Sequence, residues 1–243
     1  HYRREGISTS HCDSRELQDL HAAVLIMTKA EQLQHVRKSL EDDLETLPLG
    51  DIGEQTVPGD GNAEAEIVFI GEAPGYHESV ERKPFVGKSG QLFIKTLAEV
   101  GYPRPTVYIT NIVKVRPPEN RDPLPEEIKA YRPYLDKEIE IIAPKLIVTL
   151  GRFSMAKFLP EVKISQVHGR LHKVKWNEKF LFVLPMYHPA AALRNPQMSA
   201  SFVADFQKIP KILQWIDTKG REAIQEAEEH QELESSVKEA LFS

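Results

Sequence analysis

The stretch IVFIGEAPGYHE (67–78), followed by PFVGKSGQL (84–92), decides the fold class. Four consecutive apolar residues predict a short buried strand, and the glycines and the Pro-Gly turn after it predict a loop that leads into a helix. In an open α/β sheet, ligands bind where such loops leave the carboxyl ends of the strands. A strand–turn–helix corner without chemistry would have the same pattern, so the rest of the chain must distinguish the two.

Three further apolar strands follow at helix-sized intervals. Short, β-branched runs that are apolar throughout are typical of a parallel sheet covered on both faces. The predicted strands are 67–70, 107–110, 146–150 and 180–185, with a hairpin partner for the last at 171–176. The predicted helices are 29–44, 91–100, 125–142, 154–159 and 200–215, the last interrupted or kinked at Pro210. We therefore expect an α/β fold of three layers, α/β/α, with a central four-stranded, mostly parallel sheet.

Charge divides the chain into three parts. Residues 63–216 carry 22 basic and 16 acidic side chains, whereas both ends are acidic and the whole chain has a net charge of −5. A basic centre is compatible with contacts to phosphate groups. We expect an N-terminal extension with a helix (1–43), one domain (44–216) and an acidic, helical tail (217–243). Met27 is a credible natural start, so residues 1–26 are expected to lie outside the folded unit.

Composition limits the class of protein. Apolar residues make up 41% of the chain and charged residues 28%, which is typical of globular proteins and not of disordered ones. No apolar run approaches the roughly 18 residues of a membrane span, so no membrane partner is expected. The single cysteine, Cys12, cannot form an intramolecular disulfide, which favours a cytoplasmic protein, or a nuclear one in a eukaryote.

Four strand ends carry residues that parallel pairing would bring to one rim. They are Glu72 after the first strand, with Glu78 and Phe85 in the same loop, Asn111 after the second, the run GRFS (151–154) after the third and His188 after the fourth. An aromatic ring can stack on a base, an Asn amide can match an imide edge, a His can bond an oxygen that becomes negative, and a carboxylate can orient water. Taken singly, Phe85 would be a core residue, Asn111 a turn residue and His188 a structural hydrogen bonder. Together they predict a pocket for a nucleobase.

These residues lie in ordered motifs that resemble the uracil-DNA glycosylase superfamily, specifically its fourth, iron–sulfur type. The motifs are VPGDG (57–61), GEAPG (71–75), PFVGKSG (84–90), ITNIVK (109–114), RPP (116–118), NRDP (120–123), PEEI (125–128) and HPAA (188–191). The resemblance implies a monofunctional enzyme that flips deoxyuridine out of DNA and hydrolyses its N-glycosidic bond. The product would be an abasic site, as in base excision repair.

The resemblance also implies a role for each matching residue. Glu72, with the backbone of Ala73, would position the attacking water, and His188 would stabilise the departing uracil anion through O2. Phe85 would stack on the flipped uracil, and Asn111 would read its N3–H and O4 edge.

Further residues are expected to exclude other bases or to hold DNA. Glu78 would lie against the C5 edge of the base, where a thymine methyl group would clash. Leu193 or Arg194 would wedge into the duplex to hold the gap left by the flipped base. Composition adds candidate phosphate contacts at Lys88, Ser89, Gly151 and Arg170, with Arg116 and the amide near Gly87 beside them.

The chain departs from the fourth family at its cofactor. Members usually carry four cysteines that bind an iron–sulfur cluster, and this chain has Leu44, Leu47, Val115 and Tyr131 at those positions. Because thiolates hold such clusters, we expect no iron–sulfur cluster and no other cofactor or metal. We expect the four side chains to form an apolar plug in the place of the cluster.

Two alternatives stay open. Instead of a uracil-DNA glycosylase, the chain would be a glycosylase with broader specificity for deaminated bases, or a non-catalytic relative that binds uracil or DNA. Glu78 and Asn111 favour uracil, and the retained set of Glu72, Asn111 and His188 favours turnover. No motif in the sequence gives a lysine the role of an imine-forming nucleophile, so lyase activity is not expected. The expected partner is uracil-containing DNA, bound by a monomer.

Overall fold

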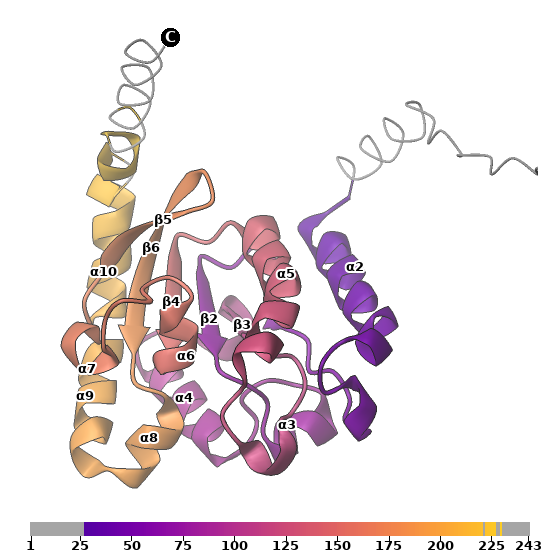
Figure 1. Ribbon diagram of the computed structural model, residues 1–243. Helices are drawn as coiled ribbons and strands as arrows, with labels where there is room; N and C mark the ends of the chain where they lie inside the picture. The colour runs from indigo at the N-terminus through magenta and orange to yellow at the C-terminus, as the bar shows by residue number, and fades with distance from the viewer. Residues whose placement is uncertain (1–26, 221, 227–228, 230–243) are drawn as a thin grey trace, which may run out of the picture.

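The computed structural model describes residues 27–220, 222–226 and 229. Its strands are β1 (Asp60–Gly61), β2 (Ile67–Gly71), β3 (Tyr108–Asn111), β4 (Leu146–Leu150), β5 (His172–Trp176) and β6 (Lys179–Met186). In the described part of the chain they form one sheet of order β1-β3-β2-β4-β6-β5 (Figure 1). The strands β3, β2, β4 and β6 pair in parallel, whereas β1 and β5 pair antiparallel at the two edges.

Helices cover both faces of this sheet. They are α2 (Lys29–Asp42), α3 (Tyr76–Glu81), α4 (Lys88–Glu99), α5 (Pro125–Ile142), α6 (Arg152–Ala156), α7 (Ile164–Val167), α8 (Pro189–Arg194), α9 (Pro196–Phe206) and α10 (Ile209–Trp215). Short turns of 3₁₀-helix lie at η1 (Leu44–Thr46), η2 (Gly50–Ile52), η3 (Arg104–Thr106) and η4 (Pro118–Asn120), and a π-helical segment, η5 (Ile216–Gly220), continues α10. Within the described residues, no helix is both long enough and apolar enough to cross a membrane.

The alternation of side chains along β2 explains the three layers. Ile67 and Phe69 belong to the apolar cluster that packs against α4, α9 and α10. Val68 and Ile70 belong to the cluster under α2 and α5. Successive side chains on a strand point to opposite faces, so a strand that is apolar throughout must be covered on both sides. The predicted α/β/α arrangement is confirmed.

Local signals set the longest helix. Pro125 occupies the first turn of α5, where its missing N–H costs no hydrogen bond. The carboxylate of Glu127 accepts a hydrogen bond from the backbone N–H of Leu124 at 2.8 Å, which caps the same end. The bounds predicted for α5 and for β4 are both confirmed. The interruption predicted at Pro210 is also confirmed: two helices, α9 and α10, cover this region, because Pro210 fits the first turn of a new helix and not the interior of a long one.

The sheet has six strands where we expected four. The four parallel strands lie in the centre as predicted, and the hairpin strand β5 forms one edge. The other edge, β1, has only two residues, too few for an alternating pattern in the sequence. Helix α8, which has only six residues and begins directly after His188, was also not predicted.

The N-terminal extension and the C-terminal end of the predicted domain both pack against the core of the domain. Helix α2, which we assigned to the N-terminal extension, packs on α5, and its Leu40 is buried. The hydroxyl of Tyr134 donates to Asp43 Oδ2 at 2.7 Å across the same contact. At the other end, Ile216 joins the apolar cluster next to the sheet. Residues 1–26 and most of the predicted tail lie outside the described residues.

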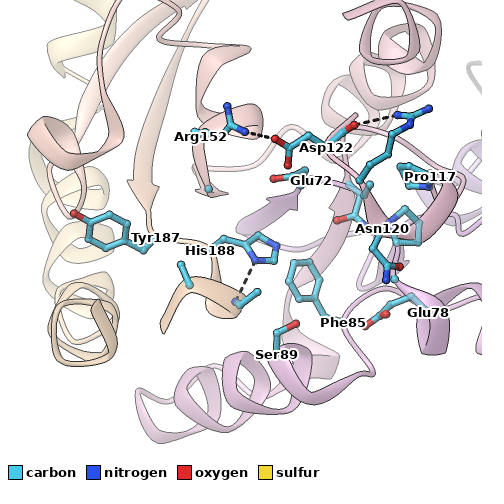
Figure 2. Close-up of a pocket in the computed structure, with 18 of the residues that line it drawn as sticks. Glu72, Glu78, Phe85, Ser89, Pro117, Asn120, Asp122, Arg152, Tyr187 and His188 are labelled. Carbon is cyan, nitrogen blue, oxygen red and sulfur yellow. Dashed lines mark hydrogen bonds and ion pairs between the residues drawn. The ribbon is translucent and has the colours of Figure 1, made fainter. Parts of the chain in front are cut away.

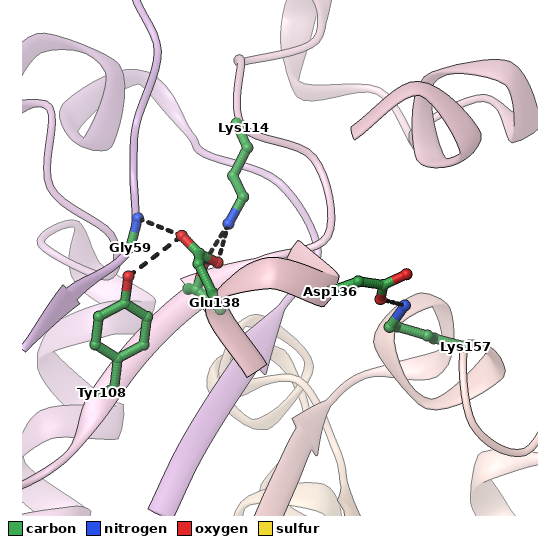
Figure 3. A network of polar contacts seen from close by, with 7 residues as sticks. Gly59, Tyr108, Lys114, Asp136, Glu138 and Lys157 are labelled. Atoms are coloured by element: carbon green, nitrogen blue, oxygen red, sulfur yellow. Dashed lines mark hydrogen bonds and ion pairs between the residues drawn. The ribbon is translucent and has the colours of Figure 1, made fainter. Parts of the chain in front are cut away.

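A buried ion pair joins the end of β3 to α5. Lys114 Nζ donates to Glu138 Oε2 at 2.6 Å, and the two side chains are 0% and 4% exposed (Figure 3). The second carboxylate oxygen accepts from the hydroxyl of Tyr108 at 3.2 Å and from the N–H of Gly59 at 3.3 Å. Burial lowers the pKa of Lys114, and the Glu138 carboxylate opposes that shift. The network therefore fixes β3 and the segment after it against α5.

Removing one partner of this pair should destabilise the fold strongly. We expect Lys114→Met to lower the free energy of unfolding by about 3–5 kcal/mol, because Glu138 would keep a buried charge without its partner. Urea denaturation measures the change. The matched control is Lys137→Met on α5, the helix that carries Glu138. There the exposed Lys137–Glu140 pair should contribute less than about 1 kcal/mol. Equal losses in the two variants would contradict this assignment.

Candidate active site

The carboxyl ends of the four parallel strands open into one cavity of about 580 Å³ (Figure 2). Nine of the predicted site residues line it: Glu72, Ala73, Glu78, Phe85, Ser89, Asn111, Gly151, His188 and Arg194. They come from segments as far apart as the loop after β2 and helix α8. Parallel pairing therefore brings the predicted constellation together.

A glycine at the end of β2 lets two of these side chains meet. Gly71 pairs with Asn111 in the β2–β3 register. A Cβ atom built on Gly71 would lie 2.3 Å from Asn111 Oδ1 and 2.5 Å from Cζ of Phe85. Any larger residue would therefore push the amide and the ring apart.

The amide of Asn111 is poised to bind a ligand. The residue is only 3% exposed, and its Oδ1 is buried with no hydrogen-bond partner among the described residues. Buried polar atoms in proteins nearly always have partners, and an unsatisfied one costs stability. An acceptor held in this state at a cavity wall indicates a ligand that brings an N–H or O–H donor.

His188 is set up as a neutral hydrogen-bond donor. It caps α8, and its Nδ1 accepts a hydrogen bond from the backbone N–H of Ala190 at 3.2 Å. Desolvation lowers the pKa of His188 to about 4, the positive charge of Arg194 adds to the shift, and Glu78 opposes it. Since Nδ1 is the acceptor in a neutral ring, Nε2 carries the proton. The ring centroid lies 5.9 Å from that of Phe85.

The carboxyl group of Glu72 has a pKa near neutral pH. Burial raises the pKa of Glu72 to about 7, the nearby Asp122 carboxylate adds to the shift, and Arg152 opposes it. Asp122, in the loop before α5, and Arg152, the first residue of α6, form an ion pair with each other. Figure 2 shows both beside Glu72 at the cavity. A carboxylate of this kind can orient water or face a developing positive charge.

Glu78 has a structural task besides its predicted contact with a base. Its Oε1 accepts hydrogen bonds from the backbone N–H groups of Val86 and Gly87 at 3.0 and 2.8 Å. These amides directly follow Phe85 in the loop before α4. The carboxylate lines the cavity and also fixes the loop that carries the aromatic ring.

The predicted DNA contacts divide into two groups. Ser89, Gly151 and Arg194 line the cavity, whereas Lys88, Arg170 and Leu193 lie outside it on the surface. Leu193 is 51% exposed on α8. Arg116 also lies outside the cavity and bonds Glu54 and Asn120. None of these four side chains would therefore touch a small ligand inside the cavity.

Sequence reasoning gave no role to five cavity residues with polar side chains. They are Asn120, Arg121, Asp122, Arg152 and Tyr187. They stand in the NRDP motif (120–123), directly after Gly151 and directly before the HPAA motif (188–191), but no role followed from these positions alone. The effect of Asp122 and Arg152 depends on their approach to Glu72, which only the folded chain reveals.

Comparison with known proteins places the fold and the site in one family. The sequence model of the uracil DNA glycosylase superfamily matches residues 58–214, about two thirds of the chain. The chain belongs to this superfamily. All of the cavity residues lie within the matched range, and the resemblance identified from the motifs is confirmed.

Several curated relatives are named type-4 uracil-DNA glycosylases. The protein from Sulfurisphaera tokodaii is 48% identical over 162 residues, which is 64% of this chain and 74% of the relative. The protein from Archaeoglobus fulgidus is 47% identical over 163 residues, 64% of this chain and 81% of the relative. The protein from Saccharolobus solfataricus is 45% identical over 163 residues, 65% of this chain and 76% of the relative.

The four positions where the resemblance leads us to expect cluster cysteines belong to, or pack against, one apolar cluster. Val115 and Tyr131 are fully buried, and Leu44 and Leu47 pack against the same apolar cluster. The hydroxyl of Tyr131 donates to the carbonyl of Pro48 at 2.6 Å. These side chains supply no thiolate and do not fit an iron–sulfur cluster. Elsewhere in the described residues, no group of three His, Cys, Asp or Glu side chains could hold a metal ion.

Changing Asp122 should change the ionisation of Glu72. Asp122→Asn removes a negative charge that raises the pKa of Glu72, so the carboxyl group should lose its proton at a lower pH than the native value of about 7. Arg152→Gln should raise that pKa. Titration of the side-chain carboxyl carbons by NMR measures both shifts.

The control for this titration is Glu126→Gln, which removes an exposed acid from the first turn of α5. It should leave the pKa of Glu72 unchanged. A native Glu72 that titrates near 4.5, or one that does not respond to Asp122, would contradict the electrostatics described above.

Proposed function

We propose that this protein is a uracil-DNA glycosylase. It flips deoxyuridine out of DNA and hydrolyses the bond between uracil N1 and the sugar C1′, leaving an abasic site. The observation that carries the proposal is the buried Oδ1 of Asn111, which has no partner within the described part of the chain and lies beside the ring of Phe85 and the neutral imidazole of His188. Uracil offers the complementary set: an N3–H donor, a flat face and a carbonyl oxygen that becomes negative.

Recognition rests on the uracil imide edge. The N3–H of uracil would donate to Asn111 Oδ1, and the Asn111 side-chain N–H would donate to O4. Cytosine has no hydrogen at N3, so its N3 lone pair would face an acceptor oxygen and repel it. A thymine methyl group would meet the carboxylate of Glu78, which two backbone amides hold in place. Rejection of cytosine and thymine thus follows from two fixed oxygen atoms.

Bond cleavage needs stabilisation of charge at both ends of the breaking bond. The electron pair of the C1′–N1 bond leaves with uracil, and His188 Nε2–H would donate to O2 of the resulting anion. A neutral imidazole suits this task, since its pKa near 4 keeps it a fixed donor across physiological pH. On the other face, ionised Glu72 would stabilise the oxocarbenium-like sugar and orient the water that adds to C1′. The proton released by that water balances the uracil anion.

DNA binding would use the surface around the cavity. Flipping a base costs a few kcal/mol in lost stacking and pairing, which contacts to the duplex must offset. The exposed side chain of Leu193 on α8 is suited to fill the gap in the duplex, and Arg194 beside it to bind a phosphate. Lys88 and Arg170 lie on the surface where further phosphates could contact them. We expect the protein to act inside the cell, as a monomer.

Cleavage of a labelled oligonucleotide with one uracil tests the proposal. Alkali treatment should reveal an abasic site at uracil, and thymine or cytosine at the same position should give none. His188→Ala should lower the single-turnover rate by about 100- to 1,000-fold, the usual cost of losing one donor to a developing anion. Cleavage at other deaminated bases would favour the broader glycosylase. Retained binding of uracil-DNA with no cleavage would favour the non-catalytic relative and overturn the proposal.

We also propose that the protein works without an iron–sulfur cluster. In its place, Leu44, Leu47, Val115 and Tyr131 form an apolar plug, and the Tyr131 hydroxyl ties the plug to the carbonyl of Pro48. The plug joins η1, the segment after β3 and α5, which are far apart in the sequence.

Metal analysis and one substitution test the plug. Purified, active protein should contain no stoichiometric iron or sulfide, and Tyr131→Phe should lower the free energy of unfolding by about 1 kcal/mol through its lost hydrogen bond. Tyr134→Phe is the control, because its hydroxyl bonds Asp43 at an exposed position on the same helix. The control should cost less. One bound cluster per chain would sink the plug proposal.

A further inference from the structure

The ring of Phe85 depends on an unfavourable backbone conformation. Phe85 has φ of 56°, in the left-handed region that bulky side chains rarely adopt. The ring is 6% exposed, packs edge-on against Phe93 and lines the cavity. A residue in this conformation persists only when its surroundings hold it there. Contacts on both sides of Phe85 provide that hold.

Arg104 holds the carbonyl groups on one side. This arginine stands at the start of η3, and its side chain is 17% exposed. Its Nη2 donates to the carbonyl of Pro84 at 2.8 Å, and its Nη1 donates to the carbonyl of Phe85 at 3.4 Å. Asp60 orients the guanidinium by accepting from Nε at 3.3 Å and from Nη2 at 3.0 Å. The planar fork of arginine allows all of these bonds at once.

Glu78 holds the amides on the other side. Its Oε1 accepts from the N–H groups of Val86 and Gly87, the two peptides that follow Phe85. A cation therefore binds the carbonyl groups up to Phe85, and an anion binds the amides after it. The glycine at position 90 allows α4 to approach this loop, because a Cβ there would lie 2.2 Å from the carbonyl carbon of Phe85.

We propose that Arg104 is a positioning residue for base stacking, acting through the backbone of Phe85. It does not line the cavity and would not touch the substrate. With Glu78 it forms a clamp that keeps the ring of Phe85 flat against the expected plane of the flipped uracil. The inference rests on the proposed function, since stacking of uracil on Phe85 is part of that function.

The test compares Arg104→Met with Lys83→Met. Lys83 also pairs with Asp60, at 3.4 Å, but its side chain bonds neither the carbonyl of Pro84 nor that of Phe85. The two variants thus remove the same charge from the same carboxylate, and only one of them opens the clamp. Thermal melting checks that each variant is folded. Single-turnover cleavage, inhibition by free uracil and affinity for abasic-site duplex are then measured.

Arg104→Met should lower the single-turnover rate by about 10- to 100-fold, the range expected when a binding group is displaced by about 1 Å. Inhibition by free uracil should weaken about tenfold, because a base loses its stacking surface. Affinity for abasic-site duplex should stay within about twofold, since no DNA contact is removed. Lys83→Met should match the native protein in all three measurements.

Three results would overturn the inference: native rate and uracil inhibition in Arg104→Met, an equal loss in Lys83→Met, or an equal loss of affinity for abasic-site duplex. If Arg104→Met does not fold, Arg104→Lys takes its place, because a single ammonium group cannot bond both carbonyls and Asp60 together. If the native protein does not cleave uracil-DNA, the proposed function fails. The clamp is then tested by a crystal structure of the Arg104 variant. A positive φ retained at Phe85 in that variant would contradict it.

Discussion

The pairing of Gly71 with Asn111 at the end of the β2–β3 ladder is the contact on which the rest of the site depends. Only a residue without a Cβ leaves room there for both the Asn111 amide and the ring of Phe85. Parallel register fixes the heights of the strand ends, so the loops carrying Glu72 and His188 reach the same cavity. The site is thus a product of sheet geometry, completed by loops that follow the strands directly.

The two groups proposed to face developing charge carry little charge of their own. His188 is uncharged and the pKa of Glu72 lies near neutral pH, although Glu78, Arg194 and the Asp122–Arg152 ion pair line the same cavity. Lys114 and Glu138 hold the end of β3, and Arg104 holds the loop of Phe85 with the help of an acidic partner. Fixed groups with little charge of their own can respond to charge that develops on a substrate without first reorganising. The buried pairs supply rigidity, and the cavity residues supply chemistry.

Much of this arrangement could be predicted from the sequence. Apolar strands, the proline at the start of α5 and the polar residues after each strand all act locally, so Asn111 and His188 could be named with their neighbours. Features that depend on contacts between loops far apart in the sequence could not be predicted. The positive φ of Phe85 cannot be inferred from its residue type, and its separation of 19 positions from Arg104 gives no periodic signal. The two-residue strand β1 and the short helix α8 are below the length at which patterns can be read.

The most direct test is a crystal structure of the protein with free uracil. Uracil should lie in the cavity with N3 within hydrogen-bond distance of Asn111 Oδ1, its face on the ring of Phe85 and its O2 next to Nε2 of His188. The same crystals soaked in thymine should show no base in that position. Uracil bound elsewhere, or bound in the cavity with Asn111 Oδ1 still unpartnered, would contradict the assignment of this cavity as the site that recognises and releases uracil.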